Sequence, residues 1–286
     1  MDKNSQFSPE WQDWIHTNIQ RGCTLQSLIE VLVANQFDPL LAAGEVAKIN
    51  RRLLAAVPSS AQQQVAYVYE PSRIEAGNSL ALTDRIVRVV TRLAKPEIVV
   101  LADFLGAEEC EELIRQSRAK IGPSTVVNPR TGTFDVIADR SSFGTYFTLE
   151  ENDLISALDR RIERLTKLPL ANGEGIQILH YPVGGEYKAH FDYFPPSDPG
   201  SAPHLAHGGQ RVATLVMYLN DVEEGGETYF PDAGGLGVVP RMGSAVYFAY
   251  CNSLGQVDSA TLHGGAPVRA GEKWIATKWI RQHAYV

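Results

Sequence analysis

After Gly175 the sequence changes from helical patterns to short apolar runs, each bounded by glycine, proline or aspartate. Two helical patterns come before this point, in residues 106–121 and 151–168, where apolar residues recur every three or four positions. The runs that follow have the length and boundaries of β-strands. They include "GIQILHYPV", "RVATLVMYLND", "GSAVYFAY" and "KWIATKWIR". Helices followed by many short strands predict an α+β fold whose core is a β-barrel or jelly roll buttressed by helices.

The first 60 residues have a helical pattern of their own. Ser8 and Pro9 are typical of a helix start, Thr24 can cap a second helix, and Asp38 precedes the proline that begins a third. The second helix has an apolar stripe, which consists of Leu25, Leu28, Ile29, Leu32 and Val33. We expect a three-helix module that uses such stripes as its own core. Docking of a partner by this module stays open.

The polar segment "VPSSAQQQ" follows these helices and predicts a linker. We therefore divide the chain into an N-terminal helical module (1–60), a linker and connecting segment (61–95) and a main domain (96–286).

The charge and cysteine content limit the partners and the location. A net charge of −7 over 286 residues argues against nucleic acid or an acidic membrane surface as a partner. No signal peptide and no apolar run long enough to span a bilayer are visible in the sequence. The three cysteines, Cys23, Cys110 and Cys251, are widely spaced, so we expect free thiols and a cytoplasmic location.

The stretch "EYKAHFDYF" places His190 two residues before Asp192. On an extended strand both side chains point to the same face, which makes half of a metal site or merely a polar strand edge. A third ligand is available in "ATLHGGAPV", where His263 follows another strand. Two histidines and one carboxylate form the facial triad of non-haem Fe(II) oxygenases, whereas a structural zinc site needs a fourth ligand and usually thiolates.

Lys273 begins the strand "KWIATKWI". Strand alternation places it on the same face as Ile275 and Trp279, where a buried ammonium needs an anion. A dicarboxylate co-substrate that chelates the metal at one end would supply that anion. Alternatively, Lys273 faces solvent while Trp274 and Ile280 face the core.

With these residues in place, the chain from about Pro96 to Arg281 resembles the collagen-type prolyl 4-hydroxylase family of 2-oxoglutarate- and Fe(II)-dependent dioxygenases. The matching segments are "PEIVVLADFLGAEECEELI", "DRSSFG", "LHYPVGGEYKAHFDYF", "GGQRVATLVMYLNDVEEGGETYFP" and "LHGGAPVRAGEKWIATKWIR". The resemblance implies a double-stranded β-helix (jelly-roll) core. It also implies that the iron ligands are His190, Asp192 and His263, with Asp192 acting as a ligand and not as a proton shuttle.

The resemblance assigns further positions one by one. Lys273 matches the residue that binds the distal carboxylate of 2-oxoglutarate, where several relatives have arginine. The other cofactor-binding positions are Tyr181 and Thr228 beside that carboxylate, and Trp279 in the inner pocket. The positions near a substrate proline are Arg140, Tyr187 and Arg211. Arg140 and Arg211 could alternatively be ordinary salt-bridge residues.

The implied reaction is hydroxylation of proline at C4 in a peptide or protein, which consumes O₂ and 2-oxoglutarate and releases succinate and CO₂. Ascorbate is an expected reductant in this family. Two alternatives remain: the same chemistry on a free amino acid or other small molecule, and a non-catalytic iron- or oxygen-sensing or scaffold protein. Between Asp192 and Arg211, the proline-rich segment 193–210 predicts a mobile loop at the mouth of the site, with His204 and His207 exposed to solvent rather than bound to metal.

Overall fold

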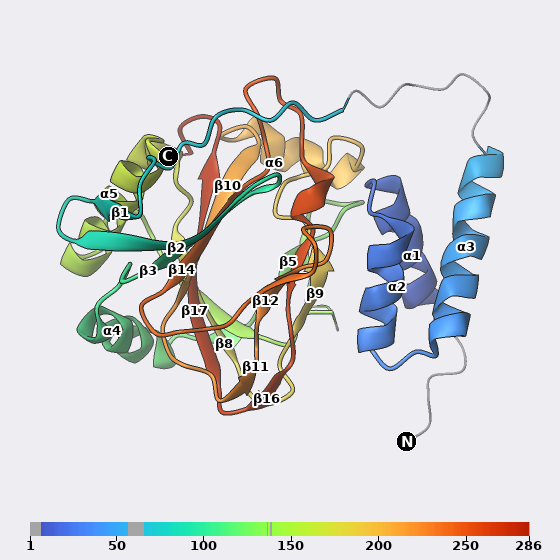
Figure 1. The fold of residues 1–286 in the computed structure, drawn as a ribbon, viewed down its shortest axis with the longest axis horizontal. Helices are drawn as coiled ribbons and strands as arrows, with labels where there is room; N and C mark the ends of the chain where they lie inside the picture. Colours follow the sequence, from blue (N-terminus) through green and yellow to red (C-terminus); the bar gives the residue numbers. More distant parts are fainter. Residues whose placement is uncertain (1–6, 57–65, 136, 138, 286) are drawn as a thin grey trace.

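The short apolar runs form two antiparallel sheets that face each other (Figure 1). The structure is a computed structural model that describes residues 7–56, 66–135, 137 and 139–285. The large sheet contains, in spatial order, β1 (Ser79–Ala81), β2 (Ile86–Ala94), β3 (Glu97–Ala102), β14 (Ala245–Ala249), β10 (Arg211–Tyr218), β17 (Lys273–Arg281), β8 (Ile176–Tyr181), β7 (Phe143–Phe147) and β4 (Gly122–Pro123). The small sheet contains β13 (Leu236–Val238), β12 (Thr228–Phe230), β15 (His263–Gly265) and β9 (Tyr187–His190).

Contacts between the two sheets close the interior of the barrel. The Phe230 ring of β12 packs edge-on against the Phe248 ring of β14, with the ring centroids 5.1 Å apart. The hydroxyl of Tyr218 on β10 donates a hydrogen bond of 2.8 Å to Oγ1 of Thr228 on β12. This arrangement confirms the predicted α+β fold with a jelly-roll core.

Two helices cover the outer face of the large sheet (Figure 1). They are α4 (Ala107–Arg118) and α5 (Asp153–Thr166), both within the predicted helical segments. Asn152 caps α5 by accepting a hydrogen bond from the backbone N–H of Ile155, and the apolar face of the helix, with Leu158 and Ile162, is buried. Because the central strands are covered on both faces, β10 and β17 are buried along nearly their whole length.

Strands β1 and β2 come from the segment expected to connect the two parts of the chain. They pair with each other, and β2 also pairs with β3, at one edge of the large sheet. The predicted start of the main domain at residue 96 therefore falls between β2 and β3, two strands that are hydrogen-bonded to each other. The predicted linker at 57–64 lies outside the described residues.

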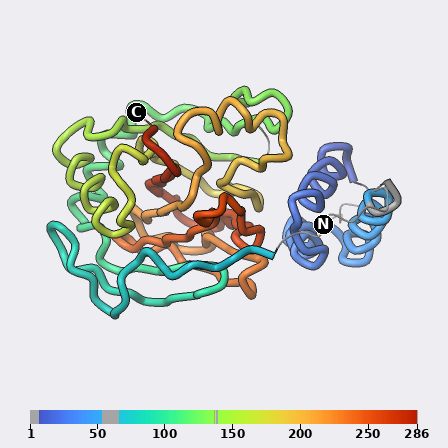
Figure 2. Tube along the Cα trace, turned by 90° about the horizontal axis from the view of Figure 1, so that it is seen from above, coloured from blue at the N-terminus to red at the C-terminus, as the bar shows by residue number. Residues whose placement is uncertain are grey.

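The N-terminal module has the three predicted helices. They are α1 (Pro9–Gln20), α2 (Leu25–Ala34) and α3 (Pro39–Ala56). Thr24 caps α2, because its side chain accepts a hydrogen bond of 3.1 Å from the Ser27 backbone N–H. In both views α3 lies farthest from the barrel (Figures 1 and 2). No helix in the described ranges combines the length and the apolar character that a bilayer span requires.

The core of this module is not separate from the barrel. Ile15, Leu28 and Val46 of the helices belong to one buried apolar cluster with Ala189 and Leu262 of the barrel. The predicted stripes thus form a core that includes part of the small sheet.

The segment 193–210, expected to be mobile, is anchored to its surroundings. It contains the short helices η2 (Pro199–Ser201) and α6 (Ala202–Ala206), beside the hairpin of β5 (Val126–Val127) and β6 (Phe134–Asp135). His204 donates to the carbonyl of Gly132 at 2.9 Å. Gly200 lies so close to that hairpin that a Cβ at this position would be 2.4 Å from the Asn128 carbonyl oxygen.

The remaining elements are short. They are η1 (Leu170–Asn172), η3 (Ser259–Thr261) and the pair of β11 (Glu224–Gly225) with β16 (Val268–Ala270).

Candidate active site

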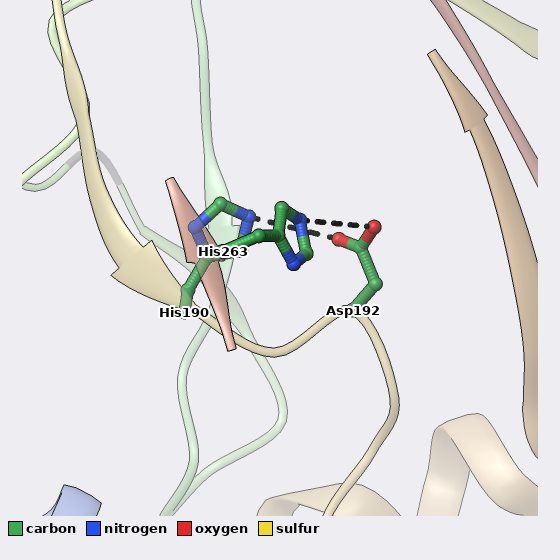
Figure 3. Close-up of side chains that lie close together, drawn as sticks. All are labelled: His190, Asp192 and His263. Atoms are coloured by element: carbon green, nitrogen blue, oxygen red, sulfur yellow. Dashed lines mark ion pairs between the residues drawn. The ribbon is translucent and has the colours of Figure 1, made fainter. Parts of the chain in front are cut away.

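Two adjacent strands of the small sheet bring the predicted metal ligands together. His190 ends β9, His263 begins β15, and the two residues are partners across the strand pair. Asp192 lies just beyond the end of β9, so the turn after the strand, and not the strand itself, orients its carboxylate. One ligand atom from each residue lies within 4.8 Å of the other two. Figure 3 shows the three side chains pointing toward one another.

Backbone carbonyls fix the tautomer of both imidazoles. Nδ1 of His190 lies 2.8 Å from the Lys188 oxygen, and Nδ1 of His263 lies 3.0 Å from the Thr261 oxygen. Because a carbonyl only accepts, each Nδ1 carries a proton, and Nε2 is the nitrogen of each ring that faces Asp192. The Nε2 atoms lie 3.7 Å (His190) and 3.4 Å (His263) from the carboxylate oxygens.

Burial and the contacts within the cluster set the protonation of His190 and Asp192. Desolvation, followed by the neighbouring His263, lowers the pKa of His190 to about 4, so its imidazole is neutral at pH 7. Although burial alone raises the pKa of Asp192, the two histidines hold it well below its usual value. Two imidazole nitrogens and one carboxylate fit Fe(II), and no further His, Cys, Asp or Glu among the described residues joins the cluster. This donor set leaves metal positions open for other ligands.

The aspartate is held by Thr214, which the sequence did not single out, and by Arg211. Oγ1 of Thr214 donates to Asp192 Oδ2 at 2.7 Å and lies 2.9 Å from the Tyr250 hydroxyl. Nη1 of Arg211 donates to the Asp192 backbone oxygen at 3.2 Å. Thr214 lies within the apolar run of β10 and is fully buried. A threonine in such a run is a signal for a buried polar contact, but its partner is 22 residues away.

Lys273 lies in the barrel interior, 2% exposed. Its Nζ is 5.3 Å from the ring centroid of Tyr181, its partner on β8. Burial lowers the pKa of Lys273 to about 8, and among the described residues no carboxylate lies within ion-pair distance of it. Trp274, on the opposite face, stacks against His180 beneath α4, so the alternative in which Lys273 faces solvent is wrong.

Tyr181 pairs with Lys273 across β8 and β17, and Thr228 is near it through Gly265 of the small sheet. Tyr181 is buried, and desolvation raises the pKa of its hydroxyl. Thr228 is paired with Gly265, and a Cβ built on Gly265 would be 3.6 Å from the Lys273 ammonium. The three predicted residues are thus neighbours.

Tyr187 and Arg140 form one side of the metal-ligand cluster. The Tyr187 ring stacks on His190 with the centroids 3.6 Å apart, and the Arg140 guanidinium lies 4.8 Å from the Tyr187 centroid. Arg140 donates to the Thr125 carbonyl at 2.8 Å and to Oε1 of Gln177 at 3.1 Å.

The guanidinium of Arg211 donates its hydrogen bonds to other groups of the protein. Its Nε and Nη2 donate to the carboxylate of Glu174 at 2.7 and 2.8 Å, and its guanidinium lies 4.0 Å from the Trp279 centroid. Glu174 also accepts from Nε of Arg281 at 2.6 Å. The indole N–H of Trp279 is buried without a hydrogen-bond partner in the described structure, and its side chain lines the cavity described next.

A cavity of about 800 Å³ opens beside the metal-ligand cluster. Its lining includes His190, Asp192 and Trp279 from the barrel, together with residues of α1. The helical stripes gave no indication that α1 would reach this cavity, since its polar face has no distinctive motif.

Comparison with known proteins agrees with this geometry. The family model of the 2OG-Fe(II) oxygenase superfamily matches residues 176–281. Probable prolyl 4-hydroxylase 10 of Arabidopsis thaliana is 35% identical over 245 residues, which cover 79% of this chain and 82% of the relative. Prolyl 4-hydroxylase 1 of the same plant is 44% identical over 203 residues, covering 66% and 70%.

A solved structure is also similar. The 2-oxoglutarate complex of the viral collagen prolyl hydroxylase from Paramecium Bursaria Chlorella virus-1 aligns with a TM-score of 0.51 and 30% identity, covering 64% of this chain and 95% of that one. The chain belongs to the prolyl 4-hydroxylase family of 2-oxoglutarate- and Fe(II)-dependent oxygenases. It is therefore an enzyme, a dioxygenase that uses Fe(II) and 2-oxoglutarate, as expected from the sequence.

Proposed function

We propose that the enzyme hydroxylates C4 of a proline residue within a peptide or protein. Each turnover consumes O₂ and 2-oxoglutarate; one oxygen atom enters the proline C–H bond and the other enters succinate, while CO₂ leaves. The observation that carries this proposal is the convergence of two Nε2 atoms and one carboxylate beside a cavity of about 800 Å³. A free proline would occupy a small part of that volume, which favours a peptide over a small molecule.

Each residue has a defined task in this proposal. His190, Asp192 and His263 hold Fe(II), which together with 2-oxoglutarate supplies the oxidative chemistry when bound. Lys273 binds the distal carboxylate of 2-oxoglutarate, because a buried ammonium without a carboxylate partner gains most from an incoming anion.

The other residues shape the two binding regions. Tyr181 and Thr228 flank the bound carboxylate, and Trp279 lines the inner cavity with its unpaired N–H available to an acceptor. Tyr187, Arg140 and Arg211 form the substrate side. Arg211 acts there chiefly by fixing Trp279 and the backbone of Asp192, since its donors are already engaged.

A cytoplasmic location and the use of ascorbate as a reductant are part of the same proposal. The three cysteines are free thiols, all buried, which fits a reducing compartment.

The test compares succinate formation in the presence of proline-containing peptides with succinate formation in the presence of free proline. Proline-containing peptides should raise succinate formation above the uncoupled rate, and mass analysis of the peptide should show one added oxygen, with 4-hydroxyproline after hydrolysis. Stimulation by free proline or another amino acid, without any response to peptides, would overturn the peptide assignment. His263→Ala serves as the inactive control.

A further inference from the structure

Helix α1 of the N-terminal module forms one wall of the active-site cavity. Glu10, Asp13, Trp14 and Thr17 follow helical spacing and line the same cavity as His190. In Figure 1, α1 lies beside β5 and β9 at the side of the barrel. The cavity is therefore a cleft between the barrel and a helix that contributes no metal ligand.

Several contacts fix α1 on the barrel. Nη2 of Arg21, just past the end of α1, lies 2.7 Å from Oδ2 of Asp198, with both side chains 17% exposed. The Lys188 ammonium of β9 lies 3.6 Å from the Trp11 centroid. These polar contacts add to the apolar cluster that the module shares with the small sheet. The wall is consequently a fixed part of the cleft.

Another part of the cleft lining is apolar and accessible. Phe134 of β6 is 67% exposed and Tyr146 of β7 is 64% exposed, and both line the cavity. Such rings provide a surface on which an extended peptide can lie.

Most basic residues around the cleft have an acidic partner, whereas two carboxylates of α1 have no basic partner among the described residues. Arg21 is paired with Asp198, Lys188 with Asp139 at 2.6 Å, and Arg211 with Glu174. Arg140, beside the metal-ligand cluster and away from α1, donates to uncharged groups. Glu10 and Asp13 are exposed and take part in no ion pair within the described ranges. Two unneutralised carboxylates on one wall favour a cation at the mouth of the cleft.

We propose that α1 is part of the substrate-binding surface and selects protein segments in which a lysine or arginine lies near the acceptor proline. The proline lies at the metal-ligand cluster, the backbone follows Phe134 and Tyr146, and the basic side chain lies beside Glu10 and Asp13. This inference rests on the proposed function, and it assigns a specificity role to a helix outside the barrel.

The experiment compares two labelled proline peptides that differ only in having lysine or glutamate at flanking positions. Fluorescence anisotropy measures their Kd with the full chain, with Mn(II) in place of Fe(II) and with 2-oxoglutarate present. Succinate formation with Fe(II) is measured in parallel. Asp13→Lys is the test variant, and Glu30→Lys is the matched control, because Glu30 is an exposed carboxylate of the same module that does not line the cleft.

The wild type should bind the lysine peptide more tightly, and Asp13→Lys should reduce this preference about two- to fivefold, the size of effect measured for exposed charge pairs. Glu30→Lys should leave the preference unchanged. Equal binding of the two peptides, or equal effects of both variants, would overturn the role of α1 while peptide hydroxylation stands. Failure of both peptides to raise succinate formation would instead overturn the proposed function.

Discussion

Arg211 and Glu174 form a two-point ion pair directly behind the metal-ligand aspartate, with N–O distances of 2.7 and 2.8 Å. Glu174 also binds Arg281, so one buried carboxylate compensates two guanidinium groups. The two arginines hold the pKa of Glu174 below its usual value despite the opposing effect of burial.

We expect Glu174→Gln to lower the free energy of unfolding by about 3–5 kcal/mol, because it leaves two arginines buried without a counter-charge. Urea denaturation measures this change. Glu112→Gln, which breaks the exposed pair with Arg115 on α4, is the matched control and should have no measurable effect. A Glu174→Gln protein as stable as the wild type would show that the pair is dispensable.

His190→Ala and His263→Ala should abolish turnover and weaken Fe(II) binding, since two ligands cannot hold the facial geometry. Asp192→Glu should also be inactive, because the added methylene displaces an oxygen from a buried, fixed position. Iron content after dialysis and succinate formation check both expectations. Full activity of any one variant contradicts the ligand assignment.

Thr214→Val should weaken metal binding about tenfold to a hundredfold, since groups that bond a metal ligand typically have effects of this size. Thr214→Ser keeps the hydroxyl that donates to Asp192 and should bind metal nearly as the wild type does. Titration with Mn(II), followed by electron paramagnetic resonance, gives the Kd of each variant. Equal Mn(II) affinities of the Thr214→Val and Thr214→Ser variants would mean that this hydrogen bond does not position the Asp192 carboxylate.

Lys273→Ala should weaken 2-oxoglutarate binding about tenfold to a hundredfold and affect metal binding little, because a charge-assisted contact to a carboxylate contributes about 1.5–3 kcal/mol. Isothermal titration in the presence of Mn(II) separates the two affinities. Lys278→Ala, on the same strand but facing α5, removes the 2.7 Å pair with Asp159 and is the matched control. It should lower stability and leave the 2-oxoglutarate affinity of the folded protein unchanged.

The affinity for 2-oxoglutarate should fall as the pH rises above about 8. Burial lowers the pKa of Lys273 to about 8 in the free enzyme, and a bound carboxylate raises it again. The complex then holds more protons than the free enzyme, so the Kd should rise nearly tenfold per pH unit above that value. A Kd that stays constant from pH 7 to 9.5 would indicate that the lysine does not contact the co-substrate.

The sequence alone was sufficient to predict those features that follow a short-range pattern. His190 and Asp192 are two positions apart, and helices α4 and α5 have clear apolar spacing. Alternation along β17 left the orientation of Lys273 open because the strand is buried on both faces, which removes the contrast between polar and apolar positions.

The remaining features depend on contacts between distant segments. Glu174 is 37 residues from Arg211 and 107 from Arg281, and nothing near it in the sequence marks its partners. The approach of α1 to the cavity likewise depends on packing between the N-terminal helices and β9. The short-range patterns that predict helices carry no information about which surface a helix will cover.

The apolar cluster shared by the module and the barrel limits how this architecture can be recombined. Ala189 and Leu262 contribute to a core whose other buried members come from the three N-terminal helices and the connections between them. A chimaera that grafts the module of one relative onto the barrel of another must therefore transplant both sides of this contact, or it will leave a void or a steric overlap at the seam. Glu10 and Asp13 of α1 face solvent, so they can be substituted without disturbing that seam. Substitutions intended to alter substrate preference are therefore better tolerated at these positions.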